Sequence, residues 1–124
     1  MEILSIVLQS LLALAFVVAG LGKIFGAKMH VEGFNHWGLP QWFRVVTGLV
    51  EVVGAAALIY GFWEPGWMTA GALLLGVTAI GGLVTHLRAK DSFNQLFPIL
   101  LLGIIAFVLF FLHYSEFTDF TGLS

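Results

Sequence analysis

The stretch VTGLVEVVGAAALIY, residues 46–60, decides the fold class of this chain. It holds a single charged residue, Glu51, among neutral and mostly apolar residues. The whole chain has the same character: of its 124 residues, 60% are hydrophobic and 10% are charged, whereas soluble domains carry about 25% charged residues. A small soluble fold exposes too much of its surface to hide so many apolar side chains. We therefore interpret the chain as an integral membrane protein.

Four apolar segments are long enough to cross a bilayer, which requires about 20 residues per helix. They cover about residues 3–22, 45–63, 66–87 and 96–114. Their length and the lack of polar–apolar alternation exclude membrane β-strands. The first segment lacks the positive n-region of a signal peptide. The sequence thus predicts an all-α bundle of four transmembrane helices in a single domain, residues 1–124.

The loop between the first two segments is long and partly apolar. Val31, Phe34 and Trp37 recur at three-residue spacing, so we expect part of this loop to lie in the membrane interface as a short helix. Within the bundle, Gly22 and Gly76 belong to small-residue patterns that favour close helix–helix contact.

The charges predict the orientation and limit the partners. All basic residues fall in the first and third connections: Lys23, Lys28, Arg44, Arg88 and Lys90. The positive-inside rule places these connections in the cytoplasm and both termini outside, in a plasma membrane of bacterial type. The net charge of −2 provides no basic field for nucleic acid. The absence of cysteine excludes disulfides, thiol redox chemistry and iron–sulfur centres in this chain.

Glu51 is the centre of the candidate site. An ionised carboxylate at a helix centre costs about 2.5–3.5 kcal/mol in the membrane, so it should face protein or a cavity. Lys23 ends the first segment and His86 lies near the end of the third, at the same side of the membrane. Arg44 lies two turns below Glu51, and Arg88 flanks the site. We therefore predict that these five residues form a binding site.

Structural interpretations stand beside this prediction. Taken alone, Lys23 is an interface anchor whose stem follows apolar surface, and His86 is an interfacial histidine. Glu51 fits a structural ion pair as well as a ligand or proton site. No metal site is expected, and His86 and His113 lie near opposite surfaces, which argues against a haem with two histidine ligands. Any cofactor is expected to be bound noncovalently.

Four motifs resemble those of the DoxX and DoxX-like family: AGLGKIFG at 19–26, GFNHWGLPQWFR at 33–44, GLVEVVGAAALI at 48–59 and THLR at 85–88. The matching positions are Gly22, Lys23, Pro40, Gly48, Glu51, Gly54 and His86. The resemblance implies a four-helix membrane protein labelled as an oxidoreductase subunit, whose founding type is associated with quinone-linked thiosulfate oxidation. A related branch of the family assists the assembly of other membrane proteins.

Three functions remain open. The first is a redox-associated subunit that binds a quinone or another small apolar molecule, with Glu51 and His86 hydrogen-bonding its oxygens or moving protons. Such a subunit is expected to form a homo-oligomer or to join a membrane or redox partner. The second is a non-enzymatic assembly or scaffold protein, and the third is a small-molecule transporter. The strong charge bias disfavours the third, because many four-helix exporters with one intramembrane glutamate insert in both orientations. We favour the first.

Overall fold

The structure is a computed structural model that describes residues 2–122. The described residues form helices and turns, and no strand occurs among them, which confirms the predicted all-α fold. In chain order the helices are α1 Glu2–Phe25, α2 Lys28–His36, α3 Gln41–Tyr60, α4 Pro65–Arg88, α5 Phe93–Leu112 and α6 Tyr114–Thr121.

Four of these helices, α1, α3, α4 and α5, are long and apolar enough to cross a membrane. Large apolar side chains cover the outside of the bundle; Val18, Val53 and Phe111 are each at least 60% exposed. Contiguous apolar surface on this scale marks contact with a membrane or a partner rather than with water. The four-helix membrane bundle predicted from the sequence is confirmed.

Several helix bounds differ from the prediction: α1 ends at Phe25 rather than near residue 22, and α3 ends at Tyr60 rather than near residue 63. α3 begins at Gln41 rather than near residue 45, because Pro40 has an extended backbone and ends the preceding loop. α5 begins at Phe93, where the Ser92 backbone N–H donates to Gln95 Oε1 at 2.9 Å, so Pro98 lies inside the helix. α5 then ends at Leu112 rather than near residue 114, and the short helix α6 follows.

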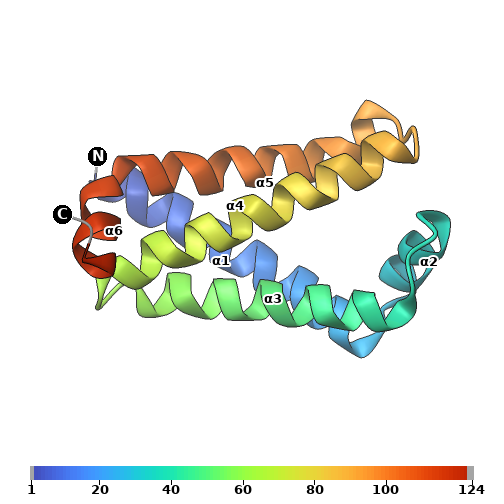
Figure 1. Cartoon of the computed structure of the whole chain (residues 1–124), viewed down its shortest axis with the longest axis horizontal. Helices are drawn as coiled ribbons and strands as arrows, with labels where there is room; N and C mark the ends of the chain where they lie inside the picture. Colours follow the sequence, from blue (N-terminus) through green and yellow to red (C-terminus); the bar gives the residue numbers. More distant parts are fainter. Residues whose placement is uncertain (1, 123–124) are drawn as a thin grey trace.

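The short helix expected in the first loop is present as α2, and its place in the membrane interface stays a prediction. Figure 1 shows α1 running along α3 and α4 running along α5, with α3 also contacting α4. The chain termini, α6 and the α3–α4 turn lie at one end of the bundle. α2 and the α4–α5 turn lie at the other end, where the α1–α3 pair diverges from the α4–α5 pair.

The packed core fills only the half of the bundle nearest the termini. Its fully buried large side chains come from all four spanning helices: Leu12, Phe16, Leu58, Leu75 and Leu109. Two glycine pairs bring backbones together: a Cβ on Gly48 would lie 2.7 Å from the Gly20 carbonyl oxygen, and one on Gly71 would lie 2.7 Å from that of Gly54. Small residues allow such close approach between membrane helices. The half of the bundle near α2 is packed less completely.

The two glycines predicted at helix–helix contacts have different neighbours. Gly76 of α4 faces the ring of Phe107 on α5, 2.9 Å from where its Cβ would lie, as predicted. Gly22 of α1 instead faces the ring of His30 on the short helix α2. Its small size therefore makes room for a side chain of α2 and not for another spanning helix.

Candidate functional site

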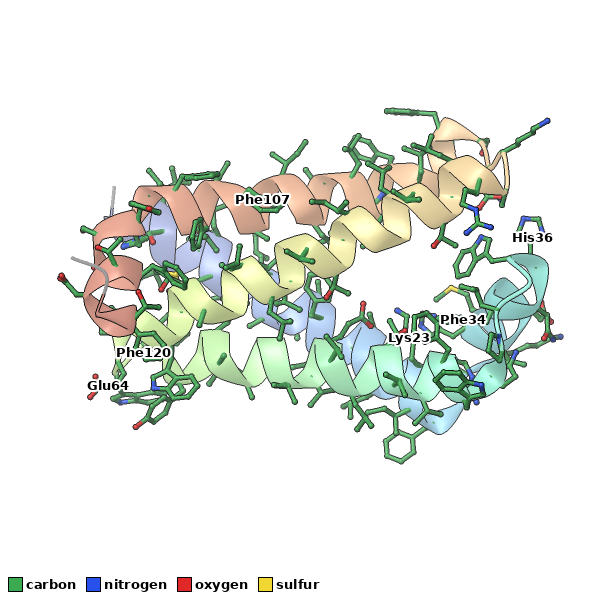
Figure 2. The ribbon with its side chains drawn as sticks, viewed as in Figure 1. Lys23, Phe34, His36, Glu64, Phe107 and Phe120 are labelled. Carbon is green, nitrogen blue, oxygen red and sulfur yellow. The ribbon has the colours of Figure 1, made fainter. Side chains whose placement is uncertain are left out.

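The less packed half of the bundle contains a cavity of about 930 Å³. Its walls come from α1, α2, α3, α4 and α5, and they include three of the predicted site residues, Lys23, Glu51 and His86. Figure 2 shows Lys23 and Phe34 at this end of the molecule, with Glu64 and Phe120 at the opposite end. A second hollow of about 580 Å³, between α4 and α5, is lined by apolar side chains and glycine alone. The larger cavity is therefore the candidate site.

Lys23 and Glu51 form an ion pair at the cavity wall, with Nζ 2.9 Å from Oε1. Their side chains are 13% and 4% exposed. Lys23 lies in the last turn of α1, and Gly48, three residues before Glu51 on α3, allows the two helices to approach there. Removing one partner of a buried pair leaves an uncompensated charge and costs about 3–5 kcal/mol. The pair therefore ties the two helices to a common arrangement.

The Glu51 carboxylate is only partly satisfied by this pair. Lys23 Nζ lies 2.9 Å from Oε1, and no other donor within the described part of the chain bonds this oxygen. The two oxygens of an ionised carboxylate offer about four acceptor positions in total. Glu51 Oε1 thus has acceptor capacity at a cavity wall.

His86 does not meet Glu51; it binds Asp91 instead. His86 Nδ1 lies 2.6 Å from Asp91 Oδ2, and His36 Nε2 lies 2.8 Å from Oδ1. Trp37 Nε1–H donates to Oδ2 at 3.0 Å, and its ring meets the His86 ring edge-on with centroids 5.0 Å apart. We call these four residues the Asp91 latch. It joins the end of α2 to the end of α4 at the rim of the cavity.

The latch is built around a carboxylate that stays ionised. The Asp91 side chain is 5% exposed, and hydrogen bonds from Trp37, His36 and His86 lower its pKa to about 2, although burial opposes the shift. Lys90 turns the chain with a φ of 58°, a conformation uncommon outside glycine. This turn allows the Asp91 backbone N–H to donate to the His86 carbonyl at 3.0 Å.

The sequence prediction missed Asp91. The available signal was modest: one acidic residue in an otherwise basic connection, five positions after a candidate histidine. In a polar loop such a residue is usually solvated, and only the folded turn brings three donors to it.

Arg44 and Arg88, also predicted at the site, lie outside the cavity lining. Arg44 donates from Nη1 to the Lys23 carbonyl oxygen and from Nε to Gln41 Oε1 at 2.7 Å. A cation at a helix C-terminus satisfies free carbonyls and interacts favourably with the helix dipole. Arg44 thus fixes the end of α1 that carries Lys23, while Arg88 is exposed at the end of α4.

His30 is a further residue of the cavity wall that the prediction did not include. Burial lowers the pKa of its ring, and the charges of Lys23 and Arg44 lower it further. Its ring rests on Gly22, where an added Cβ would lie 3.0 Å from Cδ2. His30 therefore contributes an imidazole between α1 and α2.

Comparisons with known proteins match most of the chain. A profile of the DoxX-like family matches residues 7–108, a range that holds Lys23, Glu51, His86 and Asp91. The chain belongs to the DoxX-like family. No solved structure matches it.

Two relatives of this DoxX-like protein come from Bacillus subtilis (strain 168). The chain is 31% identical over 90 residues to "Uncharacterized protein YdgD", covering 72% of this chain and 79% of that protein. It is 29% identical over 102 residues to "Putative oxidoreductase CatD", covering 82% of this chain and 73% of that protein. The second name associates a relative with oxidoreductase activity.

Proposed function

We propose that this DoxX-like protein is a redox-associated membrane subunit whose cavity binds a quinone or another small apolar molecule. The observation that carries the proposal is the cavity of about 930 Å³ with the Lys23–Glu51 pair in its wall. Small-molecule sites are concave, mostly apolar and supplied with a few polar groups that fix orientation. The name of the relative CatD agrees with a redox association.

In this proposal the protein binds and orients the molecule. Lys23 and Glu51 supply an ammonium and a carboxylate, and His86 adds an imidazole held by Asp91. The sequence has no cysteine and no cofactor motif, so electrons are exchanged with a noncovalently bound molecule or with a partner protein. A second copy of the chain or a redox enzyme in the same membrane is the proposed partner. The α2 end faces the cytoplasm and both termini face outside.

Gly81 provides the variant that tests the cavity. It lies in the cavity wall, and a Cβ added there would meet no atom within 4 Å. We expect Gly81→Leu to fill part of the cavity without displacing a neighbour. Protein purified in a mild detergent is analysed by mass spectrometry for quinones, lipids and proteins that remain bound. The wild type should retain a small apolar molecule, and Gly81→Leu should lose it.

Ala56→Leu is the matched control, because Ala56 is exposed on the outside of α3 and does not line the cavity. It should retain the molecule as the wild type does. Equal retention in both variants would refute a ligand in the cavity. If partner proteins alone co-purify with all three proteins, the assembly or scaffold function is favoured.

A further inference from the structure

The four residues of the Asp91 latch all line the large cavity: His36, Trp37, His86 and Asp91. Their exposure to solvent falls across the latch. The His36 side chain is 57% exposed, whereas those of His86 and Asp91 are 15% and 5% exposed. The latch therefore lies between the molecular surface at the α2 end and the interior of the cavity, where Lys23 and Glu51 form their ion pair.

One side of α2 is attached to α3. The buried ring of Phe34 on α2 packs against Phe43 of α3, with centroids 6.4 Å apart. Gln41, the first residue of α3, donates from Nε2 to the Val31 carbonyl oxygen at 3.1 Å and to Asn35 Oδ1 at 2.9 Å. Separation at this side is costly, because it would return a buried aromatic ring to water. The contact with α3 is therefore the fixed side of α2.

The opposite side of α2 reaches the α4–α5 turn through polar contacts. His36 and Trp37 hydrogen-bond Asp91, and the Trp37 ring meets the His86 ring edge-on. A hydrogen bond contributes little net free energy where water replaces the protein partner once the bond is broken. His36 is already exposed, so water reaches this contact. The contact with the α4–α5 turn is therefore easier to release than the contact with α3.

The chain turns at a glycine on each side of α2. Gly26, between α1 and α2, has a φ of 77°, and Gly38, between α2 and α3, has a φ of 73°. Glycine adopts such left-handed conformations at little cost, and residues at the ends of helices absorb the backbone changes when a segment moves. These two turns allow α2 to rotate about its contact with α3 without rearrangement of the spanning helices.

We propose that α2 is a lid that the Asp91 latch holds closed over the mouth of the cavity. Release of the latch separates α2 from the α4–α5 turn and gives water and polar solutes a route to the Lys23–Glu51 pair. This role goes beyond the proposed function, because it concerns access to the cavity and holds for whichever molecule occupies it. Asp91 is then the residue that joins the lid to the spanning helices.

The test measures how fast a charged reagent enters the cavity. Because the chain has no cysteine, Thr78→Cys in the cavity wall provides a single reporter. The full-length protein in lipid nanodiscs is treated with a methanethiosulfonate that carries a trimethylammonium group, which needs an aqueous route, and modification is followed by mass spectrometry. Adding Asp91→Asn should make the reaction about tenfold faster, because loss of hydrogen bonds to a charged group shifts an opening equilibrium by about this factor.

Two control variants separate opening of the lid from other effects. Val77→Cys tests entry through the bilayer, because Val77 is 56% exposed on the outside of α4 and lies outside the cavity lining. It should stay unreactive both with the native latch and with Asp91→Asn. Lys90→Gly keeps the turn and the Asp91 carboxylate, so it should leave the reaction rate of Thr78→Cys unchanged.

Equal reaction rates of Thr78→Cys with and without Asp91→Asn would overturn the proposal. Two fast rates would mean that the cavity is open while the latch is formed, and two slow rates that release of the latch does not open it. If Asp91→Asn also makes Val77→Cys reactive, α4 has unfolded in that variant, and His36→Ala decides instead. His36→Ala removes one bond of the latch and leaves Asp91 in place, so it should raise the rate at Thr78→Cys, and an unchanged rate would refute the lid. Retention of co-purifying molecules tests the proposed function separately.

Discussion

A Cβ on Gly48 would lie 2.7 Å from the carbonyl oxygen of Gly20, so α1 and α3 are in backbone contact one turn from the Lys23–Glu51 pair. Real Cβ atoms essentially never come this close to a carbonyl oxygen. The absence of side chains at these two positions is therefore what lets a lysine at the end of one helix reach a glutamate inside the next. The position of the charged pair depends on this backbone contact.

Alanine substitutions should rank the glycines by what the new Cβ meets. Among Gly48, Gly76 and Gly81, alanine at position 48 should lower thermal stability in detergent most, because a carbonyl oxygen of the facing backbone cannot move aside. Gly76→Ala should have a smaller effect, because the Phe107 ring 2.9 Å away can shift. Gly81→Ala should be neutral or stabilising, since it meets nothing and alanine is favoured over glycine in helices by about 1 kcal/mol. Equal melting temperatures for Gly48→Ala and Gly81→Ala would contradict the α1–α3 contact.

Gly66 is unsuitable as a control in this series, although a position at the start of a helix such as α4 is expected to tolerate a larger side chain. A Cβ there would lie 2.4 Å from the ring of Phe120 on α6. Gly66 therefore packs against the short C-terminal helix, and Gly81 takes its place as the control.

The ion pair predicts a strong coupling between positions 23 and 51. Glu51→Leu should destabilise the protein by about 3–5 kcal/mol, because it leaves the Lys23 ammonium buried and unpaired. Lys23→Met in the same chain should restore much of that loss, giving a coupling free energy well above the measurement error. The four proteins of the cycle are compared by reversible unfolding in mixed micelles. Additive effects of the two substitutions would mean that the pair contributes nothing as a unit.

The physics of the bilayer explains why much of this fold was predictable. Each apolar segment must span the hydrocarbon core, and a carboxylate such as Glu51 must avoid lipid, so hydropathy predicts the spans and its inward position. The sequence also places Lys23 and His86 at the same side of the membrane as Glu51, so it indicates Lys23, His86 or both as partners of the carboxylate. In the structure Lys23 pairs with Glu51 because the backbones of α1 and α3 approach at Gly20 and Gly48, and His86 binds Asp91 because the chain turns at Lys90. Neither feature has a simple sequence signal.

Contacts that depend on loop conformation are not predictable from the sequence. Asp91 in a polar loop has the sequence pattern of a solvated residue, and the turn at Lys90 is what brings it to His36 and His86. Arg44 was predicted at the binding site, but its reach to the Lys23 carbonyl depends on how α1 ends. α6 was not predicted at all, because eight residues of mixed polarity carry little signal of a helix.

Orientation is testable by cysteine labelling, because the chain has no natural cysteine. Glu64→Cys in the α3–α4 turn and Ser115→Cys on α6 are exposed positions at the end of the termini. Both should react with a membrane-impermeant maleimide added to intact cells. Lys28→Cys on α2, where the native side chain is 89% exposed, should react only after permeabilisation. Labelling of position 28 in intact cells, with positions 64 and 115 protected, would contradict the proposed topology.

Ser5 is a poor labelling position despite its place near the N-terminus. It is 7% exposed, and its hydroxyl oxygen lies 2.8 Å from His113 Nε2 at the α5–α6 junction. A cysteine there would react slowly on either side of the membrane, so Glu64 and Ser115 replace it.

The Asp91 latch predicts how α2 responds to substitution and to pH. Asp91→Asn removes the charge that binds His36 and His86, so amide hydrogen exchange in residues 28–36 should become faster. Lys90→Gly should preserve the turn and leave the exchange rate of these residues nearly unchanged.

The response to pH follows from the carboxyl pKa of Asp91, which falls from 3.8 to about 2 in the folded protein. A lowered pKa means that the stabilisation from Asp91 is full above about pH 4 and is lost as the pH falls through 2. Protection of α2 should therefore hold from pH 7 to pH 4 in the wild type and decline below that. If the amides of α2 exchange as slowly in Asp91→Asn as in the wild type, α2 is held by its contacts with α3 and α1 alone.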